Sequence, residues 1–166
     1  MERPQIKLTP TKFDKAVEVM CVVLLIAFWL LILFSFSSLP ETIPIHYNGL
    51  GEVDGYGSRN SIFMLPIIGS FLFLLLTVIN KHPELFNYNT TITPENAPKQ
   101  YANATTMIRV LKFTVILVFF IIDYWTVKIA LGKSLGLGVW LLPLVLGLIF
   151  LPLVFFIIRS FRIKVK

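Results

Sequence analysis

The sequence is poor in the residues that most often carry chemistry or covalent cross-links. Its 166 residues include one cysteine, Cys21, and two histidines, His46 and His82. A single cysteine cannot form an internal disulfide or a CxxC pair, so a disulfide framework and a CxxC metal or redox site are excluded. The chain also lacks an HExxH motif and a phosphate-binding P-loop, so neither motif indicates an enzyme class.

Charged residues are scarce as well, and apolar residues replace them. Only 14% of the residues are charged while 56% are hydrophobic, and the mean hydropathy is +0.80. These values lie far from those of a soluble domain, so we expect a single-domain integral membrane protein. The net charge of +6 has to be interpreted from the positions of the basic residues before any acidic partner is considered.

Four apolar runs are long enough to cross a membrane, which requires about 20 residues for a core of roughly 30 Å. The sequence predicts an all-α, polytopic membrane protein with spans at about residues 17–39, 61–81, 106–128 and 138–159. An outer loop at 40–60 and an inner loop at 82–105 connect them. A cleaved signal peptide is the weaker interpretation of the first run, because the apolar core of a signal peptide is shorter.

The positions of lysine and arginine predict the orientation, because short cytoplasmic loops retain positive charge during insertion. Four basic residues precede the first span, four lie around the inner loop and the start of the third span, and four follow the fourth span. The other side has only Arg59, Lys128 and Lys133. Both termini are therefore expected in the cytoplasm and the loop at 40–60 outside. Because topology accounts for the net charge, we expect no nucleic acid partner.

The outer loop is the expected site of any function. Alternation along residues 42–48 favours an extended backbone with His46 and Asn48 on one face, and Gly51 permits a reversal of the chain. Glu52 and Asp54 share a face beyond that turn, so His46 can meet two carboxylates. No cofactor is expected, but His46, Glu52 and Asp54 form a candidate site for a divalent metal. A purely structural histidine–carboxylate bond is the alternative.

The end of the outer loop has the composition of an anion site. Ser58 is placed to cap the second span, and Arg59 follows in its first turn. Free backbone N–H groups, the helix dipole and a guanidinium together attract a phosphate or carboxylate. The simpler interpretation is that Ser58 only caps the helix and Arg59 contacts lipid headgroups.

Asp123 is the one acidic residue inside a predicted span, and an ionisable group at that depth is a candidate functional residue. We expect it to face the interior of the bundle and to pair with Arg59 or His46. An interfacial carboxylate near Lys128 is the alternative.

The inner loop and the third span carry two further predictions. Thr93, Pro94 and Glu95 resemble a helix start, which would extend the third span into the cytoplasm. Lys81, Arg109 and Lys112 are expected to form a basic collar for lipid phosphates.

Several segments together resemble a known family. Residues 39–40, 43–48, 51, 54–59 and 65–66 are similar to the bacterial membrane family of unknown function that also supplies the N-terminal part of SdpI-type immunity proteins. Residues 92–97 and 100–101, leading to Arg109 and Lys112, are similar to small stand-alone members, so the resemblance covers about residues 35–115. It implies a protein of the bacterial cytoplasmic membrane. The matching motif positions are His46, Asn48, Gly51, Asp54, Ser58 and Arg59.

The resemblance implies an immunity or envelope-stress role. SdpI proteins combine toxin immunity with sequestration of a repressor. We therefore expect the outer loop to bind an anionic headgroup or a peptide toxin without turnover, with membrane lipids as neighbours and a homo-oligomer as an open possibility. The alternatives are a metal-dependent hydrolase or lipid-phosphate enzyme using His46, Glu52 and Asp54, and a transporter subunit.

Overall fold

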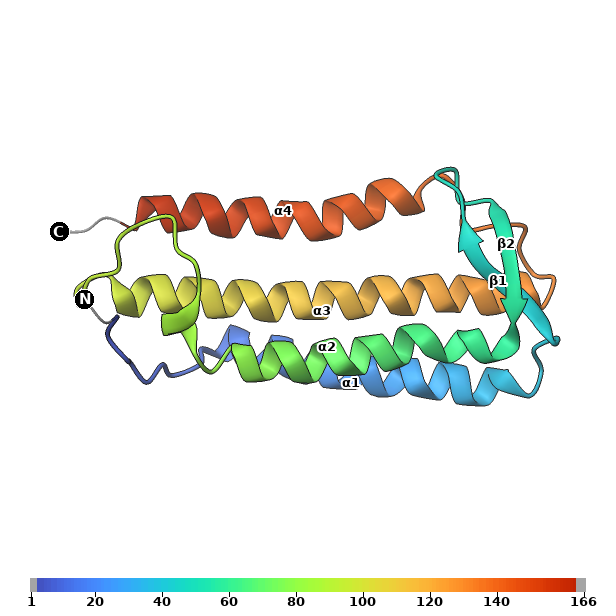
Figure 1. Ribbon diagram of the computed structural model, residues 1–166, viewed down its shortest axis with the longest axis horizontal. Coiled ribbons are helices and arrows are strands. Elements are labelled where there is room, and N and C mark those ends of the chain that lie inside the picture. The colour runs from blue at the N-terminus through green and yellow to red at the C-terminus, as the bar shows by residue number, and fades with distance from the viewer. Residues whose placement is uncertain (1–2, 164–166) are drawn as a thin grey trace.

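The computed structural model of the protein describes residues 3–163. Four long helices run side by side along one axis, and the two ends of the chain lie at the same end of the bundle (Figure 1). We call this the terminal end and the opposite one the hairpin end. The long helices are α1 (Lys12–Phe36), α2 (Met64–Ile79), α3 (Ala97–Ala130) and α4 (Leu141–Arg162).

Short elements occupy the connections. A hairpin of β1 (Thr42–Tyr47) and β2 (Val53–Ser58) links α1 to the 3-10 helix η1 (Arg59–Phe63), which leads into α2. A second 3-10 helix, η2 (Pro83–Leu85), follows α2. The predicted all-α membrane architecture is confirmed. The small antiparallel sheet is an element that the predicted architecture did not include.

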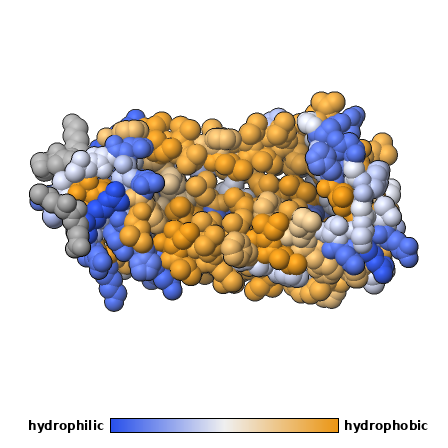
Figure 2. Space-filling model, in the orientation of Figure 1, coloured by the Kyte–Doolittle hydropathy of each residue, from blue (hydrophilic) through white to orange (hydrophobic). Residues whose placement is uncertain are grey.

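All four helices are long and apolar enough to span a membrane. On the face shown in Figure 2, a hydrophobic belt covers the middle of the bundle, and hydrophilic residues gather toward both ends. This belt is what a lipid-facing surface requires, because lipid tails solvate apolar side chains and not polar ones. Which end faces the cytoplasm stays a prediction.

Two helix starts differ from the sequence-based expectation. α1 begins at Lys12, earlier than predicted, because Thr11 and Asp14 form a capping box that satisfies free backbone donors. α3 begins at Ala97 with Asn96 as its N-cap, so the predicted start at Pro94 is wrong and Pro98 lies harmlessly in the first turn. Its 34 residues correspond to about 51 Å, so α3 exceeds the membrane thickness, as expected.

Helix α3 occupies the centre of the bundle. It packs against α1, α2 and α4, whereas α4 has no comparable contact with α1 or α2 among the described residues. The buried core lies between α1, α3 and the base of the hairpin and includes Phe28, Ile32, Ile43 and Ile116. The flank of α3 between α2 and α4 therefore has less protein covering it, and the ribbons of α2 and α4 lie apart in Figure 1.

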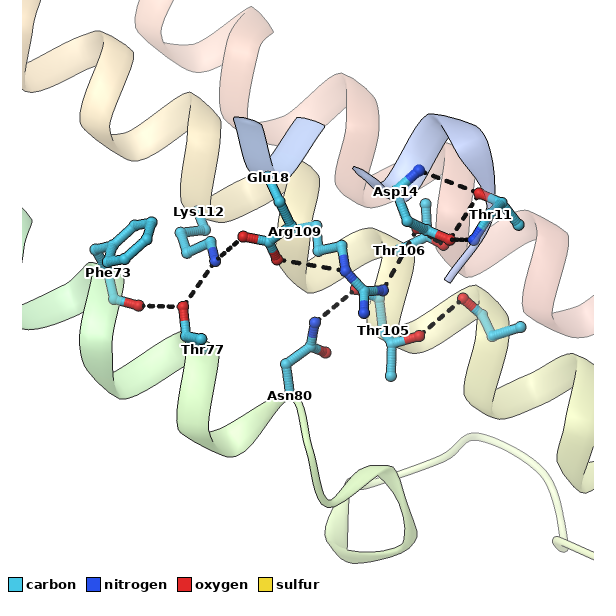
Figure 3. Close-up of polar contacts among 11 residues, drawn as sticks. Thr11, Asp14, Glu18, Phe73, Thr77, Asn80, Thr105, Thr106, Arg109 and Lys112 are labelled. Carbon is cyan, nitrogen blue, oxygen red and sulfur yellow. Dashed lines mark hydrogen bonds and ion pairs between the residues drawn. The ribbon is translucent and has the colours of Figure 1, made fainter. Parts of the chain in front are cut away.

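Four charged side chains connect α1 to α3 near the terminal end, and we call them the ion network: Asp14, Glu18, Arg109 and Lys112 (Figure 3). Glu18 accepts from Lys112 Nζ at 2.7 Å and pairs with Arg109 Nε at 3.3 Å. Arg109 also pairs with Asp14 at 3.4 Å. Two acids and two bases balance each other, which lowers the cost of placing charge inside an apolar bundle.

Helix α2 joins the ion network through Lys112. Lys112 Nζ donates to Thr77 Oγ1 of α2 at 2.8 Å and lies 4.5 Å from the centre of the Phe73 ring, also of α2. The Lys112 side chain is only 1% exposed, so its ammonium group is removed from both lipid and water. The predicted basic collar is therefore wrong for Arg109 and Lys112, because both bind carboxylates of α1 in preference to lipid phosphates.

Removal of the Lys112 ammonium should weaken the bundle. Lys112→Met leaves Glu18 with only Arg109, and loss of one partner from a buried pair costs about 3 kcal/mol of the unfolding free energy. Thermal unfolding of the detergent-solubilised protein should show a clear fall in Tm.

Lys128→Met is the matched control, because Lys128 lies on the same helix over the Tyr124 ring and forms no ion pair within residues 3–163. Adding Glu18→Gln to Lys112→Met should restore part of the loss, since one acid, Asp14, and one base, Arg109, then balance each other. Equal Tm values for Lys112→Met and the wild type would contradict a stabilising role for the network.

Candidate functional site

The hairpin turn is built around Asn48. Its side-chain Oδ1 accepts from the backbone N–H groups of Leu50 and Glu52, and its Nδ2 donates to Glu52 Oε2 at 2.8 Å. This is the local side-chain-to-backbone bonding that asparagine supplies in turns. The side chains of Asn48 and Glu52 therefore stabilise the turn of the hairpin.

Gly51 attaches the hairpin to the loop between α3 and α4. Its carbonyl accepts from Leu137 N–H at 2.7 Å, and Glu52 forms an isolated bridge with Gly136. Gly51 has a φ of +78°, and a Cβ there would lie 2.6 Å from the carbonyl oxygen of Gly138. Only glycine permits both this backbone conformation and this close approach.

His46 and Asp54 meet across the hairpin, as predicted. The distance from His46 Nδ1 to Asp54 Oδ1 is 2.5 Å, with 72% and 43% of the respective side chains exposed. Glu52 does not join them, because it bonds to Asn48. No group of three or more His, Cys, Asp or Glu side chains suited to a metal is present in the described part of the chain. The geometry thus provides two of the three predicted ligands, and the metal site stays a prediction.

Ser58 acts as a helix cap, as the simpler interpretation predicts, whereas the contact of Arg59 with lipid headgroups stays a prediction. Ser58 Oγ accepts from Asn60 N–H at 3.3 Å and so caps η1. The Arg59 guanidinium lies over the Phe36 ring, 5.1 Å from its centre, which is a cation–π contact. Arg59 therefore packs at the rim of the hairpin end and lies outside the cavity described next.

A cavity of about 530 Å³ lies beneath the hairpin, and we call it the hairpin-end cavity. This volume falls within the range of about 300–1,000 Å³ that is usual for small-ligand sites. The wall is mostly apolar and comes from β1, α2, α3 and α4. Its members include Met64 and Leu65 of α2, Ile122, Asp123 and Thr126 of α3, and Leu141, Leu142 and Val145 of α4.

Strand β1 borders this cavity along its edge. Residues 43–49, which include most of β1 and the start of the turn, line the cavity without a break. A strand that presented one face would contribute every second residue, so seven consecutive residues indicate an edge. Strand β1 pairs only with β2 in the described sheet, and Pro44, which has no N–H to donate, is typical of an edge strand.

The predicted alternation along β1 is only partly correct. Ile43 and the adjacent Pro44 are both buried, whereas Ile45 is exposed and lies against Gly57. The register shifts between Pro44 and His46 and again before Tyr47. Such bulges re-aim side chains and break the simple two-residue period.

Tyr47 anchors β1 to α3. Its hydroxyl lies 2.7 Å from Thr126 Oγ1, and Thr126 itself donates to the Ile122 carbonyl at 2.9 Å. Because a threonine hydroxyl has one proton, Tyr47 is the donor in the first bond. Burial raises the pKa of the Tyr47 phenol, and the bond to Thr126 offsets this only in part, so the phenol keeps its proton at neutral pH.

Asp123 lines the same cavity and is 4% exposed, so the prediction that it faces the interior is confirmed. Its predicted partners are wrong, because His46 bonds to Asp54 and Arg59 packs on Phe36. Lys128, the alternative, lies over Tyr124. Within residues 3–163 Asp123 forms no ion pair, and its Oδ2 has no hydrogen-bond partner. It is a buried acid to which the described part of the chain supplies no partner of opposite charge.

Sequence reasoning missed Tyr47, Thr126 and the α4 residues of this cavity. Tyr47 and Thr126 are 79 positions apart, and no local pattern connects them. The usable signal was the cluster of polar residues late in an apolar span, where Asp123 and Thr126 lie one helical turn apart.

These observations define a multi-pass membrane protein with a structured hairpin over the mouth of a four-helix bundle. Residues 22–69, from the middle of α1 to the start of α2, match a domain of unknown function, DUF1648. This region contains the predicted motif positions from His46 to Arg59. The match begins earlier and ends sooner than the expected range of 35–115.

A relative is known among curated proteins. An uncharacterized protein of Archaeoglobus fulgidus is 33% identical over 85 residues, which is 46% of each chain. The chain thus spans about half the length of this relative. No solved structure matches.

The fixed position of the hairpin can be tested at Gly51. Gly51→Ala forces a side chain into a left-handed conformation and against the Gly138 carbonyl, at a cost of about 1–3 kcal/mol. Hydrogen exchange in the loop that contains Leu137 should become at least ~10-fold faster. Gly49→Ala is the matched control, because a Cβ at Gly49 meets nothing within 4 Å. Equal exchange in the two variants would contradict the attachment.

Proposed function

We propose that the protein binds an extended peptide segment carrying a positive charge in the hairpin-end cavity, in an immunity or envelope-stress role. The observation that carries this proposal is the position of Asp123, a buried acid beside the free edge of a strand. The strand edge offers backbone hydrogen bonds to such a peptide, and the acid offers a partner for its charge.

The free edge of β1 suits an extended ligand. A peptide that adds a strand to an exposed sheet edge gains main-chain hydrogen bonds, and neighbouring pockets receive its alternate side chains. The apolar wall formed by Met64, Leu141 and Val145 can hold apolar side chains of such a peptide. The hairpin is already held near its turn by the contacts of Gly51 with Leu137 and of Tyr47 with Thr126, so little ordering is required on binding.

The buried carboxyl of Asp123 favours one of the two ligands expected from the sequence. An ammonium group, from a lysine or a free N-terminus, satisfies the buried carboxyl of Asp123. An anionic headgroup is disfavoured there, because it would face a carboxyl while Arg59 lies outside the cavity wall. The peptide is therefore the better candidate.

The resemblance and the charge distribution support the biological setting. Residues 43–48 and 54–59 resemble the membrane family of unknown function that also supplies the N-terminal part of SdpI-type immunity proteins, which act against a toxin. The bias of basic residues toward the terminal end favours cytoplasmic termini, which would turn the hairpin outward in a bacterial cytoplasmic membrane. A peptide that attacks from outside would then meet the hairpin-end cavity first.

Selection from a displayed pool of random decapeptides tests this function. The protein in nanodiscs should enrich sequences that combine alternating apolar residues with a lysine or a free N-terminus. Asp123→Asn keeps the shape of the side chain and should weaken the enriched peptides at least ~10-fold in Kd, since a charge-assisted hydrogen bond is lost. Glu41→Gln removes an exposed acid of the same end and should leave binding unchanged.

A second pair of variants tests the location. Val145→Trp fills the cavity and should abolish binding, whereas Leu146→Trp, on the next and exposed position of α4, should not. Enrichment that equals that of empty nanodiscs, that survives Asp123→Asn, or that favours acidic peptides would contradict the proposal.

A further inference from the structure

A second cavity lies at the terminal end of the bundle, and its volume is about 370 Å³. We call it the terminal-end cavity. It lies between the loop after η2 and the facing sides of α3 and α4, on the same flank of α3 as the hairpin-end cavity. Its wall includes Phe86 and Tyr88 of the loop, Asn103, Ala104 and Met107 of α3, and Phe156 of α4.

The loop that covers this cavity is held in place by the N-terminal segment. Arg3 donates to the backbone carbonyls of Glu84 and Phe86, and its guanidinium lies 5.5 Å from the centre of the Tyr88 ring. Tyr88 in turn donates to the Pro83 carbonyl at 2.8 Å and packs on Tyr101. The loop wall of the terminal-end cavity is therefore held in a defined position by hydrogen bonds and aromatic packing.

Two amides of α3 fix the opposite wall. Gln100 exchanges two hydrogen bonds with Ser160 of α4, and Asn103 Nδ2 donates to the Phe156 carbonyl at 2.9 Å. This bond orients the Asn103 amide, which is more than nine-tenths buried. Its Oδ1 has no hydrogen-bond partner among the residues that the structure describes. An unpaired buried acceptor is unfavourable, because its hydrogen bonds to water have been lost without replacement, so a donor from outside the chain would stabilise the site.

The chemistry of the wall limits what can supply that donor. None of the described residues that line the cavity has an ionisable acid or base other than the Tyr88 phenol, so a charged group would have no counter-ion inside. Ile79, Met107, Ile108 and Ile157 offer an apolar surface for a chain. The cavity also lies toward the terminal end of α3 and α4, where the hydrophobic belt gives way to hydrophilic residues.

We infer that the terminal-end cavity binds a neutral amphiphile, a long-chain molecule whose head carries a hydroxyl or amide N–H that donates to Asn103 Oδ1. This site is separate from the hairpin-end cavity and does not depend on the peptide-binding function. A free lipid alcohol, an acylglycerol and a fatty amide share this chemistry.

Photolabelling tests the site and the donor together. The probes are a 16-carbon alcohol with a diazirine in its chain and the methyl ether of the same compound, which cannot donate a hydrogen bond. Each is incorporated separately into nanodiscs with the protein, and labelled residues are mapped by mass spectrometry. The alcohol should label Met107, Ile108 and Ile157 at least ~5-fold more than the ether does.

Two alanines of α3 give a matched pair of variants. Ala104→Phe fills the cavity and should abolish this labelling, whereas Ala102→Phe, at an exposed position outside the wall, should not. Equal labelling by alcohol and ether, or labelling unchanged in a folded Ala104→Phe, would overturn the inference. The comparison of the two probes uses the wild-type protein, so it decides the question even where Ala104→Phe does not fold.

Discussion

The ion network between α1 and α3 is the constraint on which the rest of the structure depends. Lys112 and Arg109 of α3 meet Glu18 and Asp14 of α1, and Lys112 also bonds to Thr77 of α2. Directional bonds of this kind fix the rotation of three helices, which apolar packing alone specifies weakly in lipid. Because each buried charge has its partner nearby, the network is neutral and can lie inside the bundle.

A fixed α3 explains why the two ends of its exposed flank are hollow. With α1 and α2 held on one side, α4 packs against the other side of α3, where the contacts include the Gln100–Ser160 and Asn103–Phe156 bonds. The hairpin closes one end of this flank and the loop after η2 closes the other. Among the described residues, a buried side-chain oxygen without a hydrogen-bond partner belongs to a residue of each cavity wall, Asp123 in one and Asn103 in the other, and this gives each cavity a point of recognition in a largely apolar wall.

The sequence allowed the architecture and part of the site to be predicted. The spans follow from hydropathy, and local pairs such as His46 with Asp54 follow from the reversal at Gly51. The partners of Arg109, Lys112 and Asp123 could not be predicted, because they depend on how each helix is rotated against its neighbours. Lys112 and Glu18 are 94 positions apart. The placement of the hairpin likewise depends on the contact of Gly51 with Leu137, which no local pattern encodes.

The most direct test of this account is a cryo-electron microscopy map of the protein in lipid nanodiscs, with the surroundings of Asp123 resolved. The account predicts that α4 stays apart from α2, that the edge of β1 borders an open cavity, and that no basic side chain of the protein reaches the Asp123 carboxyl. A map in which α4 closes against α2, or in which an arginine or lysine of the chain pairs with Asp123, would contradict it.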